Sequence, residues 1–452
     1  MLEPSGVSTR NVADLPEGFK MTELGPLPEE WRVVRLGDVV LKMKAGGTPK
    51  RTVNEYWGGQ IPFALIEDIT HSELYLYSTK RSITEAGLRN SNAWLVPPGS
   101  LLLTMYGTIG MTAINVVPLA TNQAILAIIP SKDLDVTFAA YALRYHANRL
   151  AKENVQSTQK NISKQIVARF KVPLPPLSEQ RAIAHLLRTV QRAKEATERV
   201  IAALKELKKS LMRHLFTYGP VPLDQADQVP LKETEIGPIP EHWKVVRLGE
   251  IADFKNGINF KREDRGRGIL TIDVLNMYTD TIYPRLSGLY RVNITVRPDY
   301  LLAPGDLLFV RSSLKREGVG WTVIFPGHHE PVTFCGFLIR GRLHSKDILP
   351  EFIVNFLRLP SVRELMVSKS GKVAITNINQ GNLKAIPIPV PPLDEQREIA
   401  RILQTVDRKI EAEENRKRAL EALFKTLLHH LMTARVRLPE AFISRFEEVH
   451  HG

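Results

Sequence analysis

Two sequence patterns in this chain could carry enzyme chemistry, but neither matches the motif in full. Amino-methyltransferases use an Asn/Asp-Pro-Pro-aromatic turn. The three Pro-Pro pairs here each precede Gly or Leu, and they follow Val96, Leu174 and Val390. A phosphate-binding loop reads Gly-x4-Gly-Lys-Ser/Thr, but Gly371-Lys372 has Met366 at the first glycine position and Val373 at the last. We therefore expect no methyltransferase or nucleotide-hydrolysing centre in this chain.

Metal and redox chemistry are equally unsupported by the residue spacing. The paired histidines, His429-His430 and His450-His451, are adjacent, so a helix would place them on different faces. The single cysteine, Cys335, permits no internal disulfide, fits a reducing cytoplasm and is expected to be buried beside Phe334 and Phe337. These patterns predict a chain that is not itself an enzyme and holds no metal or cofactor.

The charge of the chain favours a polyanionic partner. The 452 residues carry a formal net charge of +13, and the basic residues are spread over both halves of the chain. The N-terminus lacks the layout of a signal peptide. Turn residues break the one long stretch without charges, so it predicts buried strands near 100–106, 111–117 and 124–129 rather than a membrane span. We expect a cytoplasmic protein of two or three domains.

Internal repetition is the clearest feature of the sequence. Residues 22–40 and 234–252 are identical at twelve of nineteen positions. KVPLPPLSEQRAIAHLLRTV at 171–190 is matched by PIPVPPLDEQREIARILQTV at 387–406. The bodies between these frames diverge, and 45–63 has no clear counterpart after 256–268. A duplicated scaffold with two diverged inserts suggests one task performed on two different targets.

A long helix is predicted after each proline-rich junction. Proline disfavours helix upstream, and Ser178 and Asp394 offer N-caps. Apolar residues then recur at steps of three and four, which predicts an antiparallel coiled coil between the two helices. The first seam comprises Ile183, Leu186, Val190, Ala193, Thr197, Val200, Leu204, Leu207 and Leu211. The second comprises Ile399, Ile402, Val406, Leu420, Leu423 and Leu427, with Lys409, Glu413 and Arg416 in its polar middle. A solvent-exposed amphipathic helix packed on its own domain is the alternative.

Several short motifs resemble the target recognition domains of type I restriction-modification specificity subunits. In the first half these are Gly46-Gly47-Thr48-Pro49, Tyr56-Trp57-Gly58-Gly59, Ile61-Pro62-Phe63, Pro98-Gly99, Gly107-Thr108-Ile109-Gly110, Thr121-Asn122-Gln123 and Gln159-Lys160-Asn161-Ile162. The second half repeats Asn377-Ile378-Asn379 and the PPL-[SD]-EQR junction, while its interior departs from the first. The resemblance covers roughly residues 22–433.

The resemblance implies an α+β chain with internal duplication and pseudo-twofold symmetry. We expect an N-terminal tail (1–21), target recognition domain 1 (22–176), spacer helix 1 (177–217), a linker (218–233), target recognition domain 2 (234–393), spacer helix 2 (394–433) and a C-terminal tail (434–452). Such subunits read an asymmetric bipartite site on double-stranded DNA. Two modification (methyltransferase) subunits and the restriction (motor-nuclease) subunits join them, so S-adenosylmethionine, ATP and Mg are expected in the partners and no cofactor in this chain.

DNA contacts are expected from residue types that read bases or bind phosphates. Arg and Lys can read guanine, and Asn and Gln can read adenine. Candidates in the first half are Lys44, Thr48, Lys50, Arg51, Asn122, Gln123, Gln159, Lys160 and Asn161. Candidates in the second half are Lys255, Lys261, Arg262, Arg265, Arg311, Lys315, Arg316, Lys372 and Asn377. Trp31 and Trp243, equivalent in the repeat, are expected to be core anchors.

Two other classes of function are compatible with parts of the sequence. A self-sufficient methyltransferase or nuclease would require the motifs that the chain lacks. A coiled-coil adaptor without specific DNA binding could use the duplicated domains for two protein partners.

Overall fold

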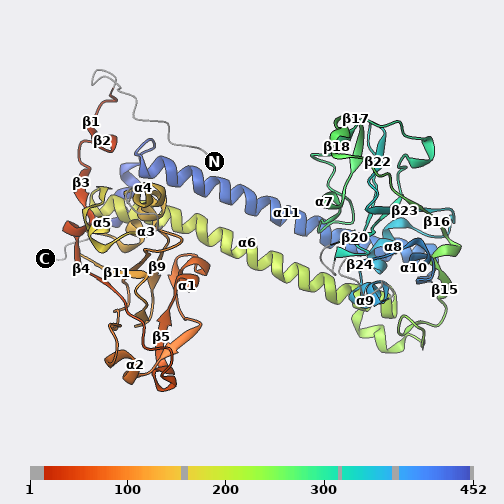
Figure 1. Cartoon of the computed structure of the whole chain (residues 1–452), viewed down its shortest axis with the longest axis horizontal. Coiled ribbons are helices and arrows are strands. Elements are labelled where there is room, and N and C mark those ends of the chain that lie inside the picture. Colours follow the sequence, from red (N-terminus) through yellow and green to blue (C-terminus); the bar gives the residue numbers. More distant parts are fainter. Residues whose placement is uncertain (1–14, 154–160, 314–317, 369–375, 448–452) are drawn as a thin grey trace. The chain divides into compact units, whose positions relative to one another are not determined.

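A computed structural model describes residues 15–153, 161–313, 318–368 and 376–447 (Figure 1). The chain divides into two compact units. Unit 1 contains residues 1–196 and 417–452, and unit 2 contains residues 197–416. Each long helix begins in one unit and ends in the other. None of the helices in the described ranges is long and apolar enough to cross a membrane.

Unit 1 is a mixed α/β domain closed by the ends of the two long helices. Its strands are β1 (Phe19–Thr22), β2 (Gly25–Pro28), β3 (Arg32–Arg35), β4 (Val40–Ala45), β5 (Trp57–Ala64), β6 (Tyr75–Leu76), β7 (Arg81–Ile83), β8 (Leu101–Thr104), β9 (Thr112–Asn115), β10 (Ala120–Thr121), β11 (Ile125–Pro130) and β12 (Lys171–Leu174). Its helices are α1 (Ile66–His71), α2 (Glu85–Arg89), α3 (Val136–Tyr145), α4 (Ala147–Lys152), α5 (Lys164–Arg169), the start of α6 (Leu177–Tyr218) and α12 (Glu440–Ile443), with 3-10 turns η2 (Leu36–Val39), η3 (Asn54–Tyr56) and η9 (Ser444–Phe446).

Unit 2 repeats most of this order, but its described residues have no strand corresponding to β6 and no α-helix corresponding to α2. Its strands are β13 (Leu231–Lys232), β14 (Ile239–Pro240), β15 (Lys244–Arg247), β16 (Ala252–Asn256), β17 (Arg265–Ile272), β18 (Tyr290–Val292), β19 (Leu307–Val310), β20 (Ser312–Ser313), β21 (Thr322–Ile324), β22 (Val332–Phe334), β23 (Leu338–Leu343), β24 (Thr376–Asn377) and β25 (Pro387–Val390). Its helices are α7 (Val274–Met277), α8 (Pro350–Leu357), α9 (Pro360–Ser368), α10 (Gln380–Lys384) and α11 (Leu393–Met432), with 3-10 turns η4 (Leu223–Gln228), η5 (Leu248–Glu250), η6 (Arg262–Asp264) and η7 (Pro298–Tyr300).

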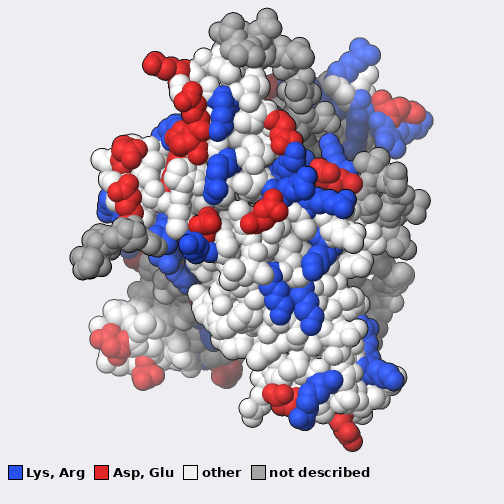
Figure 2. All heavy atoms as spheres, turned by 90° about the vertical axis from the view of Figure 1, so that its left-hand side faces the viewer, with Lys and Arg blue, Asp and Glu red and all other residues white. Residues whose placement is uncertain are grey.

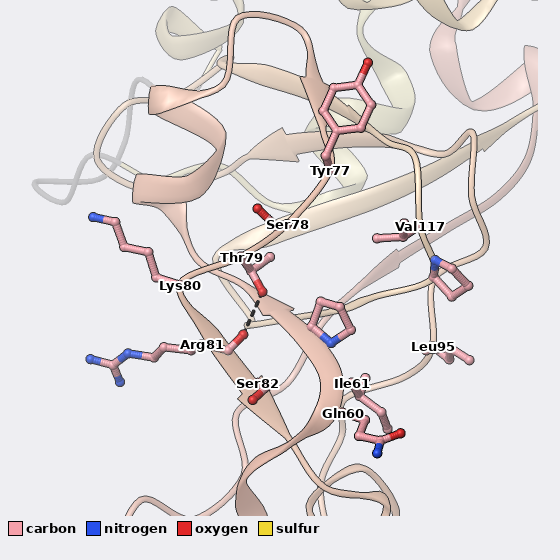
Figure 3. A pocket seen from close by; sticks show the side chains of 12 residues that line it. Gln60, Ile61, Tyr77, Ser78, Thr79, Lys80, Arg81, Ser82, Leu95 and Val117 are labelled. Atoms are coloured by element: carbon pink, nitrogen blue, oxygen red, sulfur yellow. Dashed lines mark hydrogen bonds between the residues drawn. The ribbon is translucent and has the colours of Figure 1, made fainter.

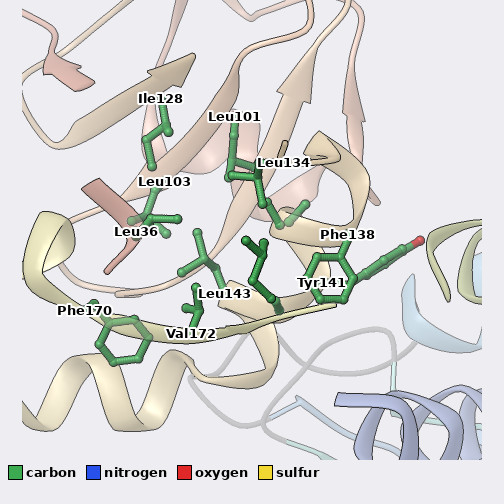
Figure 4. Packing of buried hydrophobic residues seen from close by; sticks show 14 of the residues in the cluster. Leu36, Leu101, Leu103, Ile128, Leu134, Phe138, Tyr141, Leu143, Phe170 and Val172 are labelled. Carbon is green, nitrogen blue, oxygen red and sulfur yellow. The ribbon is translucent and has the colours of Figure 1, made fainter. Parts of the chain in front are cut away.

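The central sheets of the two units have matching strand orders. Unit 1 has β4-β11-β8-β9-β6, and unit 2 has β16-β23-β19-β21. The predicted strands near 100–106, 111–117 and 124–129 are confirmed as β8, β9 and β11. Apolar residues such as Leu101, Leu103 and Ile128 fill the space between this sheet and α3, with Phe138 on the helix side (Figure 4).

The diverged bodies also share one topology, which corrects the expectation that 45–63 has no counterpart in the second half. In unit 1, β5 pairs in parallel with β10 and antiparallel with β7. In unit 2, β17 pairs in parallel with β22 and antiparallel with β18. Both long strands carry a bulge at the same place, so the registers equate Trp57 with Arg265 and Ile61 with Ile269. The residue types differ there, and this hid the equivalence from sequence comparison.

The junction motif EQR ties each body to its long helix. The indole nitrogens of Trp31 and Trp243 each donate to a glutamate oxygen, of Glu179 and Glu395 respectively, at 2.8 Å. Both indoles are buried, so the prediction that they are core anchors is confirmed. Burial raises the pKa of the Glu179 carboxyl, and this effect outweighs the lowering of the pKa by the hydrogen bond from Trp31 and the charge of Arg437.

The next residue of the motif, Gln180 or Gln396, is a buried crosslink. In unit 1 the Gln180 amide accepts from Asp135 N at 2.9 Å and donates to two backbone carbonyls, of Asp133 and Pro175. Gln396 makes the same three bonds, to Leu349 N, Asp347 O and Pro391 O. The repeated junction therefore has a structural explanation in both units.

The N-cap predictions for the two long helices are wrong. α6 starts at Leu177 and α11 at Leu393, so Ser178 and Asp394 lie inside the first turn rather than at the N-cap. Glu179, Asp394 and Glu395 are acidic residues in these first turns, where the helix dipole favours them.

The two long helices run antiparallel where unit 2 contains both of them. Lys208 Nζ lies 2.5 Å from Asp407 Oδ1, and Lys205 Nζ lies 3.3 Å from Glu414 Oε1. Burial outweighs the attraction of Lys208 and raises the pKa of Asp407. This part of the interface is polar.

The buried face of the helices shifts in phase relative to the predicted seam. Ile183, Val190, Thr197 and Ile399 are buried as predicted. The partly buried seam positions are Leu186, Ala193, Leu204, Leu211, Ile402, Val406, Leu420 and Leu427. Of the polar middle, Glu413 is buried, whereas Lys409 and Arg416 are exposed. Val200, Leu207 and Leu423 are also exposed, and residues off the predicted seam are buried instead: Leu187, Ile201, Met212, Leu403 and Ile410. An α-helix drifts by about 20° per heptad from a strict 3.5-residue repeat, so a seam extrapolated over several heptads moves off the buried face.

Candidate functional site

The ends of three neighbouring strands bring the candidate DNA-contact residues of each unit to one edge of the central sheet. Because β11 runs antiparallel to both β4 and β8, the carboxyl ends of β4 and β8 lie beside its amino end. The corresponding strands of unit 2 are β16, β19 and β23. We call this the loop edge: residues 46–53, 105–110, 122–124 and Asn161 in unit 1, and residues 257–264, 311–313, 335–337 and Asn377 in unit 2.

In unit 1, the candidate polar residues are held together by short contacts. Thr48 Oγ1 donates to Gln123 Oε1 at 2.6 Å, which joins the loop after β4 to the turn before β11. Asn161 forms a bridge with Tyr106 directly after β8. Gln123 is exposed and Asn122 is half-buried. The structure therefore places Thr48, Asn122, Gln123 and Asn161 on one edge.

Basic residues flank this group. Lys44 is exposed near the end of β4. Its Nζ lies 5.5 Å from the centroid of the Trp94 ring, and Lys42 Nζ lies 4.5 Å from the same centroid. Lys50 and Arg51 are exposed in the loop 46–53. Cations stacked on an indole keep most of their charge available to a phosphate on the open side.

A glycine at the end of the first strand lets the chains approach closely in both units. A side chain at Gly46 would meet Thr121 O at 1.9 Å, and one at Gly257 would meet Cys335 O at 2.0 Å. Both distances are too short for any Cβ atom, so only glycine allows the backbone of the loop to lie this close to the backbone of the turn.

In unit 2, the loop edge is built in the same way from different residues. Ile378 N donates to Arg311 O at 2.9 Å, as Ile162 N does to Met105 O in unit 1. The Ser312 hydroxyl donates to Asn377 Oδ1. Lys261 and Arg262 are exposed on the loop after β16.

Three basic candidates of unit 2 have ion-pair partners within their own unit: Lys255, Arg265 and the exposed Lys261, whose Nζ lies 3.3 Å from Glu263 Oε1. Lys255 pairs with Asp299 and lies 4.0 Å from the centroid of Tyr300, and this contact lowers the pKa of Asp299. Arg265 stacks 4.3 Å from the centroid of Tyr290 and reaches Asp273 at 3.5 Å, with half of its side chain exposed. The remaining candidates, Gln159, Lys160, Lys315, Arg316 and Lys372, lie outside the described residues.

The turn before β11 and β23 is where the two units differ most at the loop edge. The sheet registers equate Asn122-Gln123-Ala124 with Cys335-Gly336-Phe337. Ala124 is 8% exposed, whereas Phe337 is 59% exposed. Phe337 was expected beside Cys335 in the core; Cys335 and Phe334 are buried there, but Phe337 is not. Sequence reasoning missed Phe337 as a candidate, and only its repeat position, next to that of Gln123, could have indicated it.

Charge does not mark out a site on the face of the molecule that Figure 2 shows. On the face of Figure 2, Lys and Arg side chains are interspersed with Asp and Glu rather than gathered into one stripe. Within the described ranges there is also no group of three or more His, Cys, Asp or Glu side chains suited to hold a metal ion.

A hollow of about 590 Å³ on unit 1 lies at the other end of β10 from the turn 122–124 (Figure 3). Lys80 and Arg81 point away from Leu95 and Val117 in this view. The sheet registers equate Ser82 and Val117 with Arg291 and Glu330, which pair at 2.8 Å in unit 2. In unit 2 an ion pair thus occupies these equivalent positions, and the hollow of unit 1 is separate from the loop edge.

Comparison with known proteins agrees with the duplicated architecture. A family model for the type I restriction modification DNA specificity domain matches twice, over residues 28–206 and 240–422. The MjaVIII specificity subunit of Methanocaldococcus jannaschii is 27% identical over 443 residues, covering 93% of this chain and 96% of its own. The EcoBI specificity subunit of Escherichia coli is 23% identical and covers 87% of this chain and 77% of its own.

A solved structure supports the fold. The type I restriction-modification S subunit of M. genitalium superimposes with a TM-score of 0.55 at 16% identity, covering 89% of this chain and 96% of that one. Since the family model matches most of the chain, the chain belongs to the type I restriction-modification DNA specificity family: it is a specificity subunit, a DNA-recognition chain and not a catalytic one.

Proposed function

We propose that each unit reads one half of an asymmetric bipartite DNA site with its loop edge. This proposal rests on the observation that two units with the same topology present different side chains at their loop edges. The turn at 122–124 presents an amide, whereas the equivalent turn at 335–337 presents an aromatic ring. Two different reading surfaces on equivalent frames fit two different half-sites.

The candidate residues divide by the chemistry that they offer. Gln123, Asn161 and Asn377 carry amides that can bond adenine, and Arg311 can bond guanine. The exposed cations Lys44, Lys50, Arg51, Lys261 and Arg262 suit phosphates, which position the protein without reading sequence. Lys255 and Arg265 have partners within unit 2, and we assign them a supporting role.

The proposal includes the partners that act on the bound DNA. Two modification subunits would dock on this chain, bind S-adenosylmethionine and methylate adenine, and restriction subunits would supply ATP- and Mg-dependent cleavage. A cytoplasmic complex fits the buried free thiol of Cys335. The proposal gives this chain no cofactor of its own.

Methylation mapping tests this function directly. Single-molecule sequencing compares cells that express the partner methyltransferase with and without this chain. We expect methyladenine only with the chain, at two short motifs separated by a fixed gap. A complex that assembles and yet leaves no bipartite mark would contradict the proposal and favour an adaptor role.

A further inference from the structure

The second unit presents an exposed aromatic ring on a rigid turn at its loop edge. Leu338 N donates to Cys335 O at 2.9 Å and closes the turn around Gly336 and Phe337. Arg311 N donates to Phe337 O at 2.8 Å and ties the turn to the end of β19. The backbone of Phe337 is thus fixed from both sides, while its ring is 59% exposed.

The neighbouring turn residue, Gly336, packs against Asn259, so a larger residue there would require the Asn259 side chain to move. A Cβ at Gly336 would lie 1.8 Å from Asn259 Oδ1. Cys335 N donates to Ile272 O at 3.0 Å, and its thiol donates to Asp273 Oδ1 at 3.2 Å, which joins the turn to the start of α7. The turn therefore presents one side chain outward, that of Phe337.

The segment that follows β17 exposes large apolar side chains where the equivalent segment of unit 1 has polar ones. Leu275 on α7 is 79% exposed, and Tyr278, directly after α7, is 39% exposed. Equivalent capping bonds, Leu65 N to Asp68 and Asp273 N to Asn276, equate these residues with Glu67 and Thr70 of α1. An aromatic ring exposed at the loop edge costs free energy in water, which points to a ligand with an apolar group.

We propose that Phe337 is a specificity-determining residue that contacts the 5-methyl group of a thymine in the half-site of unit 2. The inference rests on the proposed function and deepens it. Thymine is the only base that presents a methyl group in the major groove, and apolar side chains recognise it by contact. Arg311 and Asn377 lie on the same edge and supply polar contacts around this position. The half-site of unit 2 then contains an A·T pair, and unit 1 reads its own half-site from the equivalent turn with the Gln123 amide.

The test measures binding of the assembled complex with its modification subunits to duplexes in which each thymine of the mapped target is replaced by uracil, one at a time. For wild type, one position in one half-site weakens about fourfold, the factor expected for one methyl-sized apolar group left in water. In Phe337→Ala the thymine duplex weakens by a similar factor, and the thymine-to-uracil ratio at that position falls to about one. Phe337→Leu retains part of the ratio.

Tyr77→Ala is the matched control, because Tyr77 is 66% exposed on unit 1 and lies away from the loop edge. It is expected to leave every thymine-to-uracil ratio unchanged. A half-site without any A·T pair, or a ratio that Phe337→Ala leaves intact, overturns the inference. So does a Phe337→Ala complex that fails to assemble with the modification subunits, because Phe337 would then be a protein contact. If no duplex is bound specifically by wild type, the proposed function itself fails.

Discussion

The two units share their frame but differ at their loop edges. The Trp–Glu and Gln contacts of the junction recur with nearly equal distances, at Trp31–Glu179 and Trp243–Glu395. By contrast, the turn before β11 has the buried Ala124 where the turn before β23 has the exposed Phe337. The frame keeps the bonds that hold a turn in place, and the side chain on that turn is free to differ. Duplication of this kind allows one fold to recognise two different ligands.

The largest effect is expected from changing the connection between the two reading surfaces. One heptad inserted after Ala196 in α6 and one after Arg416 in α11 should abolish methylation of the original site. The new site should have a longer gap, by up to about three base pairs, since seven helical residues add about 10 Å. Methylation mapping of cells with the extended chain measures the gap. An unchanged gap would show that the helices do not set the spacing.

The shared frame predicts matched losses of stability in the two units. Gln180→Leu and Gln396→Leu each remove three buried hydrogen bonds and leave backbone groups without partners, so each should cost about 3 kcal/mol. Hydrogen exchange of peptides from each unit reports the loss and its location. Gln165→Leu, at an exposed position on α5, is the control and should change stability by less than about 0.5 kcal/mol. A large effect in one unit alone would contradict the equivalence of the frames.

The divergent edges predict that base reading can be altered in one half-site at a time. Gln123→Ala should weaken recognition about tenfold, since an amide contact to adenine contributes about 1–3 kcal/mol of discrimination. The methylated motif should lose one specified base in one half-site and keep the other half-site intact. Gln60→Ala, an exposed glutamine away from the loop edge, should leave the motif unchanged. Relaxation of both half-sites together would argue against independent reading.

The smallest effect is expected at the junction glutamate, Glu179 or Glu395, which has a different charged partner in each unit. Arg437, from the segment after α11, donates to Glu179 Oε1 at 3.1 Å and also pairs with Glu30. In unit 2, Glu395 is instead paired with His242 Nε2 at 2.7 Å. Arg437→Ala should therefore destabilise unit 1 alone, by about 1 kcal/mol, because the pair is partly exposed to solvent. Urea unfolding combined with hydrogen exchange measures this loss, and Arg435→Ala is the neighbouring control.

Much of the architecture was predictable because it depends on sequence patterns among residues that are close together in the chain. The repeated junctions, the proline stops and the three- and four-residue spacing specified two domains and two long helices. The strands β8, β9 and β11 followed from apolar runs between turn residues. Residue type alone also drew attention to Thr48, Gln123 and Asn161, which the structure brings to one edge.

The sequence by itself thus determined the duplication, the fold class, the long helices and the family resemblance, since each depends on patterns between near neighbours. Only the tertiary structure decided the rest. Pairing of distant strands showed that β5 and β17 are equivalent despite unlike residues. It also placed Phe337 on the loop edge of unit 2, in the turn equivalent to the one that contains Gln123 in unit 1, and not in the core. The phase of the helix interface and the engagement of Lys255 with Asp299 were also fixed by contacts between distant segments. Such contacts depend on the path of the whole chain, and a one-dimensional pattern does not specify it.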